Sequence, residues 1–145
     1  MKRLAGQVFT AGTISLAVVL TIFSSAAAEV QFIQPAELKK MIEGRADIVI
    51  VDSQIKGAYD AGHIPGAINF PWSEHLKSAG GLARTKPVII YCACGQDEKS
   101  TDMAGQLMSR FGYKNVKVLK GGWLKWLELG YPQEKTGKKK SMRQP

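Results

Sequence analysis

Residues 88–101 read VIIYCACGQDEKST, and this stretch decides the fold. Its first four residues are apolar on both faces of an extended chain, which is typical of a strand buried inside a parallel sheet. A helical pattern follows, with Met103 and Leu107 on one face, and we expect Ser100 or Thr101 to cap its start. The stretch therefore predicts a buried strand, a short loop that holds both cysteines of the chain, and a helix.

Strand and helix patterns alternate on either side of this unit. Further strands are expected at 29–33, 48–51, 67–70 and 116–119, and further helices at 35–42, 59–61, 72–78 and 123–129. This alternation predicts an α/β domain with a mainly parallel central sheet and helices on both of its faces. The chain has 145 residues, which favours one domain, and we place that domain at 29–134.

The formal net charge of +8 comes from the ends of the chain. Lys2 and Arg3 lie at the start, and five basic residues lie in the tail, 135–145. Between Glu29 and Glu134 there are 13 Lys and Arg against 12 Asp and Glu, so the body lacks the basic stripe that nucleic acid requires. We expect the tail to be a disordered, solvated end, with weak contact to a membrane surface or an acidic partner as the alternative.

The N-terminus is typical of a secretory signal peptide. Lys2 and Arg3 precede 25 uncharged residues that end in Ala26-Ala27-Ala28. We expect residues 1–28 to be removed and the domain to work in the periplasm or as a secreted protein. An uncleaved N-terminal helix that anchors the domain in a membrane is the alternative.

The loop with Cys92 and Cys94 is the candidate reactive site. A thiol between a strand and a helix start lies near backbone N–H groups and the positive end of the helix dipole, and both favour the nucleophilic thiolate. Because side chains alternate along a strand, thiols two residues apart can point into the same pocket. The alternatives are inert buried thiols, a labile disulfide, or a metal site. The metal site is disfavoured because neither histidine of the chain, His63 or His75, has ligand spacing to the cysteines.

Three blocks of the sequence together resemble the rhodanese (thiosulfate sulfurtransferase) domain family. The most specific is GHIPGAIN at 62–69, which follows Asp52-Ser53-Gln54. The others are the strand, cysteine loop and helix at 88–107, and LKGGW at 119–123 with its continuation to Pro132. The resemblance covers about residues 30–132 and implies a rhodanese-like fold.

The resemblance also implies an activity. A loop cysteine takes a sulfane sulfur from a donor such as thiosulfate, becomes a persulfide, and passes the sulfur to cyanide or a thiol, without a metal or organic cofactor. Counted back from the helix, Cys94 takes the catalytic place, which we favour; counted forward from the strand, Cys92 takes it. The remaining loop residues are the expected substrate-binding set: Gly95, Gln96, Asp97, Glu98, Lys99 and Ser100.

The loop departs from the family pattern in its charge. Asp97 and Glu98 stand where the family has neutral or basic residues, and they are expected to repel thiosulfate unless they face water. Gln54 replaces an Arg that is usually structural. His63, Trp123 and the Gly121-Gly122 pair are expected to belong to the scaffold, the glycines by allowing a close backbone approach to the active loop.

Two other functions compete with sulfur transfer. The first is a rhodanese fold without turnover that binds sulfur compounds or a partner protein. The second is a phosphatase or arsenate reductase, which needs an Arg six residues after its Cys to clamp an oxyanion. The residues at that spacing from Cys92 and Cys94 are Glu98 and Ser100, so the sequence disfavours this second function.

Overall fold

The computed structural model describes residues 29–136, so the expected signal peptide and most of the tail lie outside the described residues. Five parallel strands form one sheet in the order β1-β5-β4-β2-β3. They are β1 (Gln31–Ile33), β2 (Val49–Asp52), β3 (Ile68–Asn69), β4 (Val88–Tyr91) and β5 (Val116–Leu119). The helices are α1 (Pro35–Glu43), α2 (Lys56–Ala61), α3 (Glu98–Phe111) and α4 (Gly122–Glu128). The prediction of a parallel α/β domain is confirmed.

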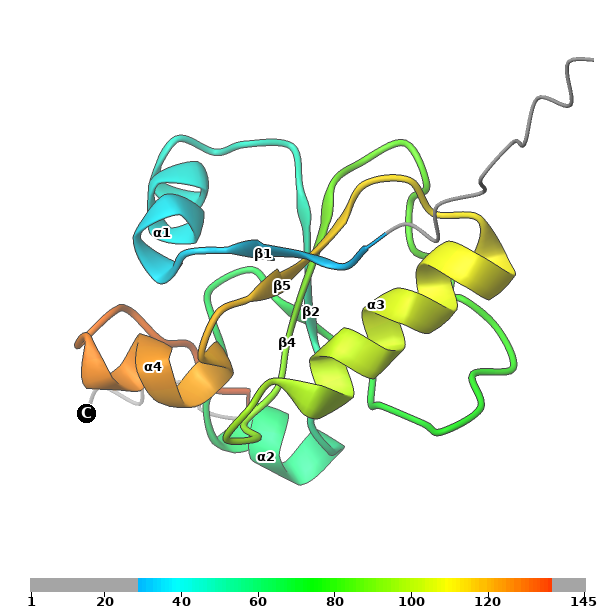
Figure 1. Cartoon of the computed structure of the whole chain (residues 1–145). Helices are drawn as coiled ribbons and strands as arrows, with labels where there is room; N and C mark the ends of the chain where they lie inside the picture. The colour runs from blue at the N-terminus through cyan, green and yellow to red at the C-terminus, as the bar shows by residue number, and fades with distance from the viewer. Residues whose placement is uncertain (1–28, 137–145) are drawn as a thin grey trace, which may run out of the picture.

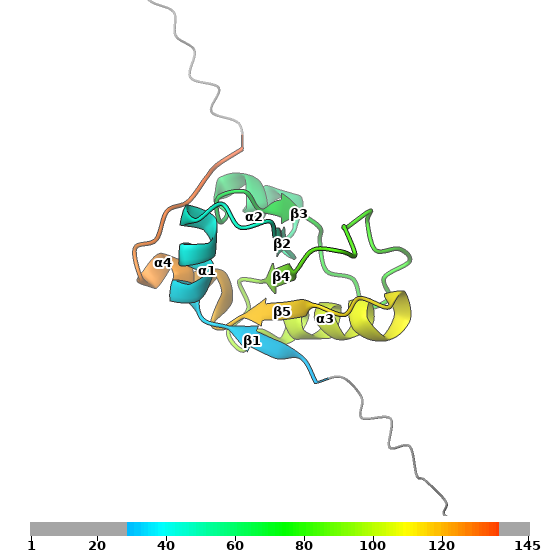
Figure 2. The same cartoon turned by 90° about the horizontal axis from the view of Figure 1, so that it is seen from above.

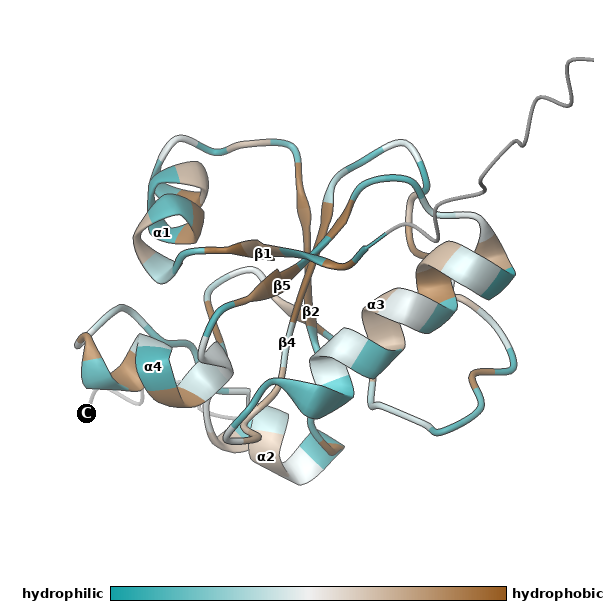
Figure 3. Ribbon diagram, viewed as in Figure 1, coloured by the Kyte–Doolittle hydropathy of each residue, from teal (hydrophilic) through white to brown (hydrophobic). Residues whose placement is uncertain are grey.

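The sheet separates two hydrophobic cores, because neighbouring residues of each strand point to opposite faces. On β4, Val88 and Ile90 pack toward α3, whereas Ile89 and Tyr91 pack on the other face with residues of α1 and α4. Figure 2 shows α3 on one side of the sheet and α1 and α4 on the other. The strands are mostly hydrophobic, and the helices are amphipathic (Figure 3). Helices on both faces were predicted.

The prediction of a helix at 72–78 is wrong. This segment has no helical turns, and its backbone groups bond to α3 instead: Leu76 N–H donates to Gln106 Oε1, and Gln106 Nε2 donates to the carbonyl of Ser73. The indole of Trp72 likewise donates to Asp102 on α3. Since these partners replace the bonds of a helix, the segment lies as an irregular cover over the α3 core.

The start of α3 also differs from the prediction. The helix begins at Glu98, and Asp97 is its N-cap residue, so Ser100 and Thr101 lie inside the first turn. Ser100 Oγ donates back to the carbonyl of Asp97 at 2.9 Å. The end of the helix is as expected, because Gly112 closes it with a φ of 72°.

The connections reverse direction between β2 and β4, which are neighbours in the sheet. From β2 the chain passes through α2 outward to β3, and from β4 it passes through α3 to β5 on the other side. Figure 1 shows the loop from β4 to α3 at the end of the sheet where α2 and α4 also begin. In parallel α/β folds this switch point, at the carboxyl ends of the strands, is where ligands bind.

The end of the described chain is tied to the domain. His63 and Glu134 exchange backbone hydrogen bonds of 2.9 Å in both directions as an isolated antiparallel bridge. Within residues 29–136, no helix has the length and apolar character needed to cross a membrane.

Candidate active site

A pocket of about 420 Å³ opens at the switch point between β2 and β4. Its walls come from the turn after β2, the segment after β3 and the loop after β4: Ser53, Gln54, Ile55, Ala58, Pro71, Trp72, Cys92, Ala93, Cys94, Glu98 and Lys99. We call it the thiol pocket. Both cysteines line it, as the alternation argument predicts, although β4 itself ends at Tyr91.

Cys92 and Cys94 are joined by a disulfide, with Cα atoms 5.4 Å apart. Cys92 is 2% exposed, whereas Cys94 is only partly buried. Two donors lie near Cys92 Sγ: the backbone N–H of Cys94 at 3.4 Å and the hydroxyl of Ser100 at 3.5 Å. After reduction, the N–H of Cys94 would favour a thiolate at Cys92, and the start of α3 adds its dipole. The hydroxyl of Ser100 has one proton, so it donates to Cys92 Sγ only when it releases the carbonyl of Asp97.

The glycine pair at the start of α4, Gly121 and Gly122, packs against the cysteine loop. Trp123 N–H donates to the carbonyl of Cys92 at 2.8 Å. A Cβ added to Gly122, whose φ is +51°, would lie 2.2 Å from that same carbonyl oxygen. Only glycine permits this approach, so the expected scaffold role of the pair is confirmed.

Asp97 does not face water. It is 2% exposed, and its Oδ2 accepts a hydrogen bond of 2.8 Å from the N–H of Gly121. Its Oδ1 is buried and lacks a hydrogen-bond partner among the described residues. Its own backbone is left-handed, with a φ of 59°, a conformation that Asp tolerates better than most residues. Asp97 therefore ties the cysteine loop to the start of α4.

Glu98 and Lys99 are exposed and line the thiol pocket. The carboxylate of Glu98 accepts a hydrogen bond of 3.1 Å from the backbone N–H of Gln96. The ammonium of Lys99 lies 5.4 Å from the ring centre of Trp72. A negative and a positive side chain thus stand together at the pocket wall.

The expected substrate-binding residues divide between two sides of the loop. Glu98 and Lys99 line the thiol pocket, and Ser100 is buried beneath Cys92. The other three, Gly95, Gln96 and Asp97, line a second hollow of about 580 Å³, shared with residues of α1, Lys120, Gly121, Lys125 and the chain after α4. The structure therefore does not bring all six residues to the thiols.

Sequence reasoning missed the opposite wall of the pocket, which contains Ser53, Gln54 and Trp72. Ser53 and Gln54 follow β2 directly, so their place at the carboxyl end of a strand was the signal that could have found them. Trp72 lies in the segment that was expected to be helical, where its orientation toward the pocket could not be foreseen.

A buried acid supports this wall. Asp52 is fully buried at the end of β2, and its carboxylate accepts hydrogen bonds from Tyr91 Oη at 2.7 Å and from the backbone and side chain of Gln54. Burial raises the pKa of Asp52 above its usual value, although these hydrogen bonds oppose the shift. Burial and the adjacent carboxyl of Asp52 raise the pKa of Tyr91. The network connects the strand ends that carry Gln54 and Cys92.

His63 has a structural role, as expected. Its ring stacks on Tyr59 with centroids 3.9 Å apart, and its Nδ1 lies 2.8 Å from the carbonyl of Tyr59, which can only accept. The ring is absent from the walls of the thiol pocket. It fixes the turn after α2.

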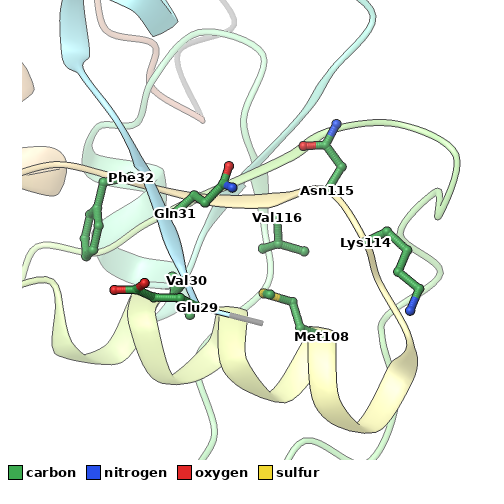
Figure 4. A pocket seen from close by; sticks show the side chains of 8 residues that line it. All are labelled: Glu29, Val30, Gln31, Phe32, Met108, Lys114, Asn115 and Val116. Carbon is green, nitrogen blue, oxygen red and sulfur yellow. The ribbon is translucent and has the colours of Figure 1, made fainter. Parts of the chain in front are cut away.

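Another hollow, of about 590 Å³, lies at the opposite end of the strands from the thiol pocket. Figure 4 shows its walls at the start of β1 and β5 and along the last turns of α3, with Val30, Met108 and Val116 facing one another. It contains neither cysteine and lies at the amino ends of the strands, away from the switch point.

A model of the family described as rhodanese-like domain matches residues 34–129, which is more than half of the chain. The chain belongs to the rhodanese-like domain family. The match spans both walls of the thiol pocket, including the loop from β4 to α3.

Curated relatives share this domain within longer proteins. The domain is 37% identical over 89 residues to a Mycobacterium leprae protein named "Putative thiosulfate sulfurtransferase", covering 50% of this chain and 31% of that protein. It is 32% identical over 89 residues to the sulfur carrier protein TtuD of Thermus thermophilus, covering 51% and 30%. This chain therefore spans about a third of the length of these relatives.

Solved structures agree with the fold. The BH2092 protein of Bacillus halodurans has a TM-score of 0.65 at 29% identity, covering 73% of this chain and 77% of that one. The rhodanese-like domain of the Alr3790 protein from Anabaena has a TM-score of 0.64 at 26% identity, covering 81% and 88%. The rhodanese-like fold predicted from the sequence is confirmed.

Proposed function

We propose that this domain is a sulfurtransferase that carries a sulfane sulfur as a persulfide on the cysteine loop. The observation that carries the proposal is that both cysteines of the chain line one pocket at the switch point of the sheet. Relatives named for thiosulfate sulfur transfer and for sulfur carriage support the same chemistry.

The reaction requires the reduced loop, because a sulfur held in a disulfide is not a nucleophile. A thiolate attacks the outer sulfur of thiosulfate, the bond between the two sulfur atoms breaks, and sulfite leaves with the electron pair. The resulting persulfide then gives its outer sulfur to cyanide or to an acceptor thiol, and the thiolate is restored. This is covalent catalysis in two steps.

We assign the first attack to Cys94. Both cysteines line the pocket, but Cys94 is only partly buried, whereas Cys92 is 2% exposed. A donor that enters the pocket therefore meets Cys94 first. Lys99 supplies a positive charge for an anionic donor, and Glu98 opposes it.

Mass spectrometry of the cysteine peptide tests the proposal. The reduced domain and the single variants Cys92→Ser and Cys94→Ser are incubated with thiosulfate or inorganic polysulfide, and the excess donor is removed. We expect one added sulfur atom on Cys94 in Cys92→Ser and none in Cys94→Ser. Sulfur uptake that persists in the double serine variant would contradict a cysteine carrier.

Export and partners are proposed on the sequence alone. We propose that the domain works in the periplasm or outside the cell after removal of residues 1–28, and that its partners are a small sulfur donor and a thiol acceptor. Cell fractionation with the mature N-terminus sequenced tests this proposal. An N-terminus at Met1 in the cytoplasmic fraction would contradict it.

A further inference from the structure

The domain holds two thiols at its reaction centre, and a single-cysteine carrier would need only one. Cys92 and Cys94 are separated by one residue, and the fold brings their sulfur atoms into a covalent bond. Both residues line the same pocket. A persulfide formed on either cysteine therefore has a second thiol within bonding reach.

The surroundings of the two thiols differ. Cys92 Sγ has the N–H of Cys94 and the hydroxyl of Ser100 as neighbouring donors, and it is shielded from solvent. Cys94 is the more accessible of the two. This geometry favours two different roles. The accessible thiol reacts with the sulfur donor, and the shielded thiol then attacks the persulfide that has formed.

We propose that Cys92 resolves the persulfide on Cys94, so that the domain reduces sulfane sulfur to hydrogen sulfide. This proposal rests on the proposed function, because the persulfide must form first. It adds an activity that differs from transfer to cyanide or to an external thiol.

The step balances without an external oxidant. The thiolate of Cys92 attacks the inner sulfur of the persulfide, which is Cys94 Sγ. The bond between Cys94 Sγ and the outer sulfur breaks, and the outer sulfur leaves as HS⁻ with the electron pair. The two thiols are oxidised to the Cys92–Cys94 disulfide, and the sulfane sulfur is reduced to sulfide.

The product of this step is the disulfide that the structure contains. A dithiol reductant must reopen it by thiol–disulfide exchange before the next cycle. Because Cys92 attacks within the same loop, its attack needs no encounter with a second molecule and competes well with external acceptors. Sulfide release is therefore expected to dominate when the acceptor is scarce and the reductant is a dithiol.

A single-turnover experiment tests the resolving role. Reduced wild-type protein and Cys92→Ser, each freed of reductant, receive excess thiosulfate, and sulfite, sulfide and peptide masses are followed together. Sulfite reports uptake of sulfur, and sulfide reports its release. Circular dichroism confirms that both proteins are folded, and Cys92→Ala repeats the test with a smaller side chain that cannot donate a hydrogen bond.

We expect the wild type to release sulfite and then sulfide, ending as the disulfide without added sulfur. Cys92→Ser and Cys92→Ala should release sulfite but retain the added sulfur on Cys94, with sulfide release slowed by about tenfold or more. Cyanide added afterwards should recover the retained sulfur as thiocyanate.

The contradicting results are distinct. Sulfide release from Cys92→Ser at the wild-type rate, or a wild type that keeps a stable persulfide, would overturn the resolving role and leave the sulfur carrier intact. A persulfide retained on Cys92 in Cys94→Ser, and none in Cys92→Ser, would reverse the two roles and overturn this assignment. Absence of sulfur uptake from both thiosulfate and polysulfide would overturn the proposed function and this inference with it.

Discussion

At the scale of single residues, Glu98 is the acidic side chain of the thiol pocket, beside Lys99. Its carboxylate lines the pocket and accepts the N–H of Gln96, and its negative charge repels an anion. Replacing Glu98 with Gln removes the negative charge. Because exposed charges contribute about 1 kcal/mol, we expect kcat/KM for thiosulfate to rise by about fivefold, less so at high salt.

The matched control is Glu43→Gln, which removes the same charge from α1, a helix outside the thiol pocket. We expect kcat/KM for thiosulfate to stay near the wild-type value. Steady-state kinetics at low and high ionic strength compare the two variants. A Glu98→Gln enzyme that is unchanged or slower with thiosulfate would show that this acid does not oppose the donor.

Asp52 predicts a pH dependence of stability. Burial raises its pKa in the folded protein, so the folded state binds the proton more tightly than the unfolded state does. Its contribution is complete below the unfolded pKa and is lost as pH rises through the raised folded pKa. The free energy of unfolding of the wild type minus that of Asp52→Asn should therefore fall as pH rises from below 3.8, the usual pKa of an Asp side chain, toward neutrality.

Asp60→Asn provides a control of opposite sign. The hydrogen bond from Lys56 lowers the pKa of Asp60, so its contribution is present at neutral pH and is lost as pH falls through the lowered folded pKa. Urea unfolding over a pH series measures both differences. If the Asp52 difference increased with pH, folding would lower the pKa of Asp52, which contradicts the raised pKa argued from its burial.

At the scale of elements, the start of α4 positions the cysteine loop. Ala at Gly122 would place a Cβ against the carbonyl oxygen of Cys92 in a backbone with positive φ. We expect Gly122→Ala to lower the free energy of unfolding by about 3 kcal/mol and to reduce sulfur transfer strongly. Thermal unfolding and thiosulfate consumption measure the two effects.

Gly130→Ala separates backbone strain from the clash. Its φ is +65°, but an added Cβ would meet no atom within 4 Å. Only the strain of a left-handed backbone remains, about 1 kcal/mol, and the cysteine loop is not touched. Equal losses of activity in the two variants would show that the contact with Cys92 is not what positions the loop.

Elements with a clear apolar period could be predicted from the sequence, and elements whose shape depends on distant side chains could not. The pattern VIIY predicts β4 because both of its faces are buried. The segment 72–78 has a helix-like composition, yet Gln106 and Asp102 on α3 bind its polar groups. The loop motif identified the two thiols, but the wall with Gln54 and Trp72 arises from tertiary packing.

At the scale of the whole molecule, we expect the disulfide to affect the reactivity of the loop and not the architecture of the domain. It joins residues two apart within one loop and links no separate elements, so it closes too small a ring to restrict the unfolded chain much. We expect the oxidised and reduced domains to have the same far-UV circular dichroism and melting temperatures within about 2 °C.

Oxidation of the two thiols to the disulfide should abolish sulfur transfer. The oxidised domain should consume no thiosulfate, and a dithiol reductant should restore consumption. Thiosulfate consumption before and after reduction, with the reductant removed, checks this expectation. Full consumption by a domain whose disulfide is verified by mass would show that the loop thiols are not the nucleophiles.

Transfer of labelled sulfur tests the central claim most directly. Thiosulfate labelled in its outer sulfur is given to the reduced domain with cyanide, and the label in thiocyanate is measured for the wild type and for the double variant Cys92→Ser, Cys94→Ser. Sulfur carriage by the loop predicts labelled thiocyanate from the wild type and only the uncatalysed background from the double variant. Equal label from both proteins would contradict it.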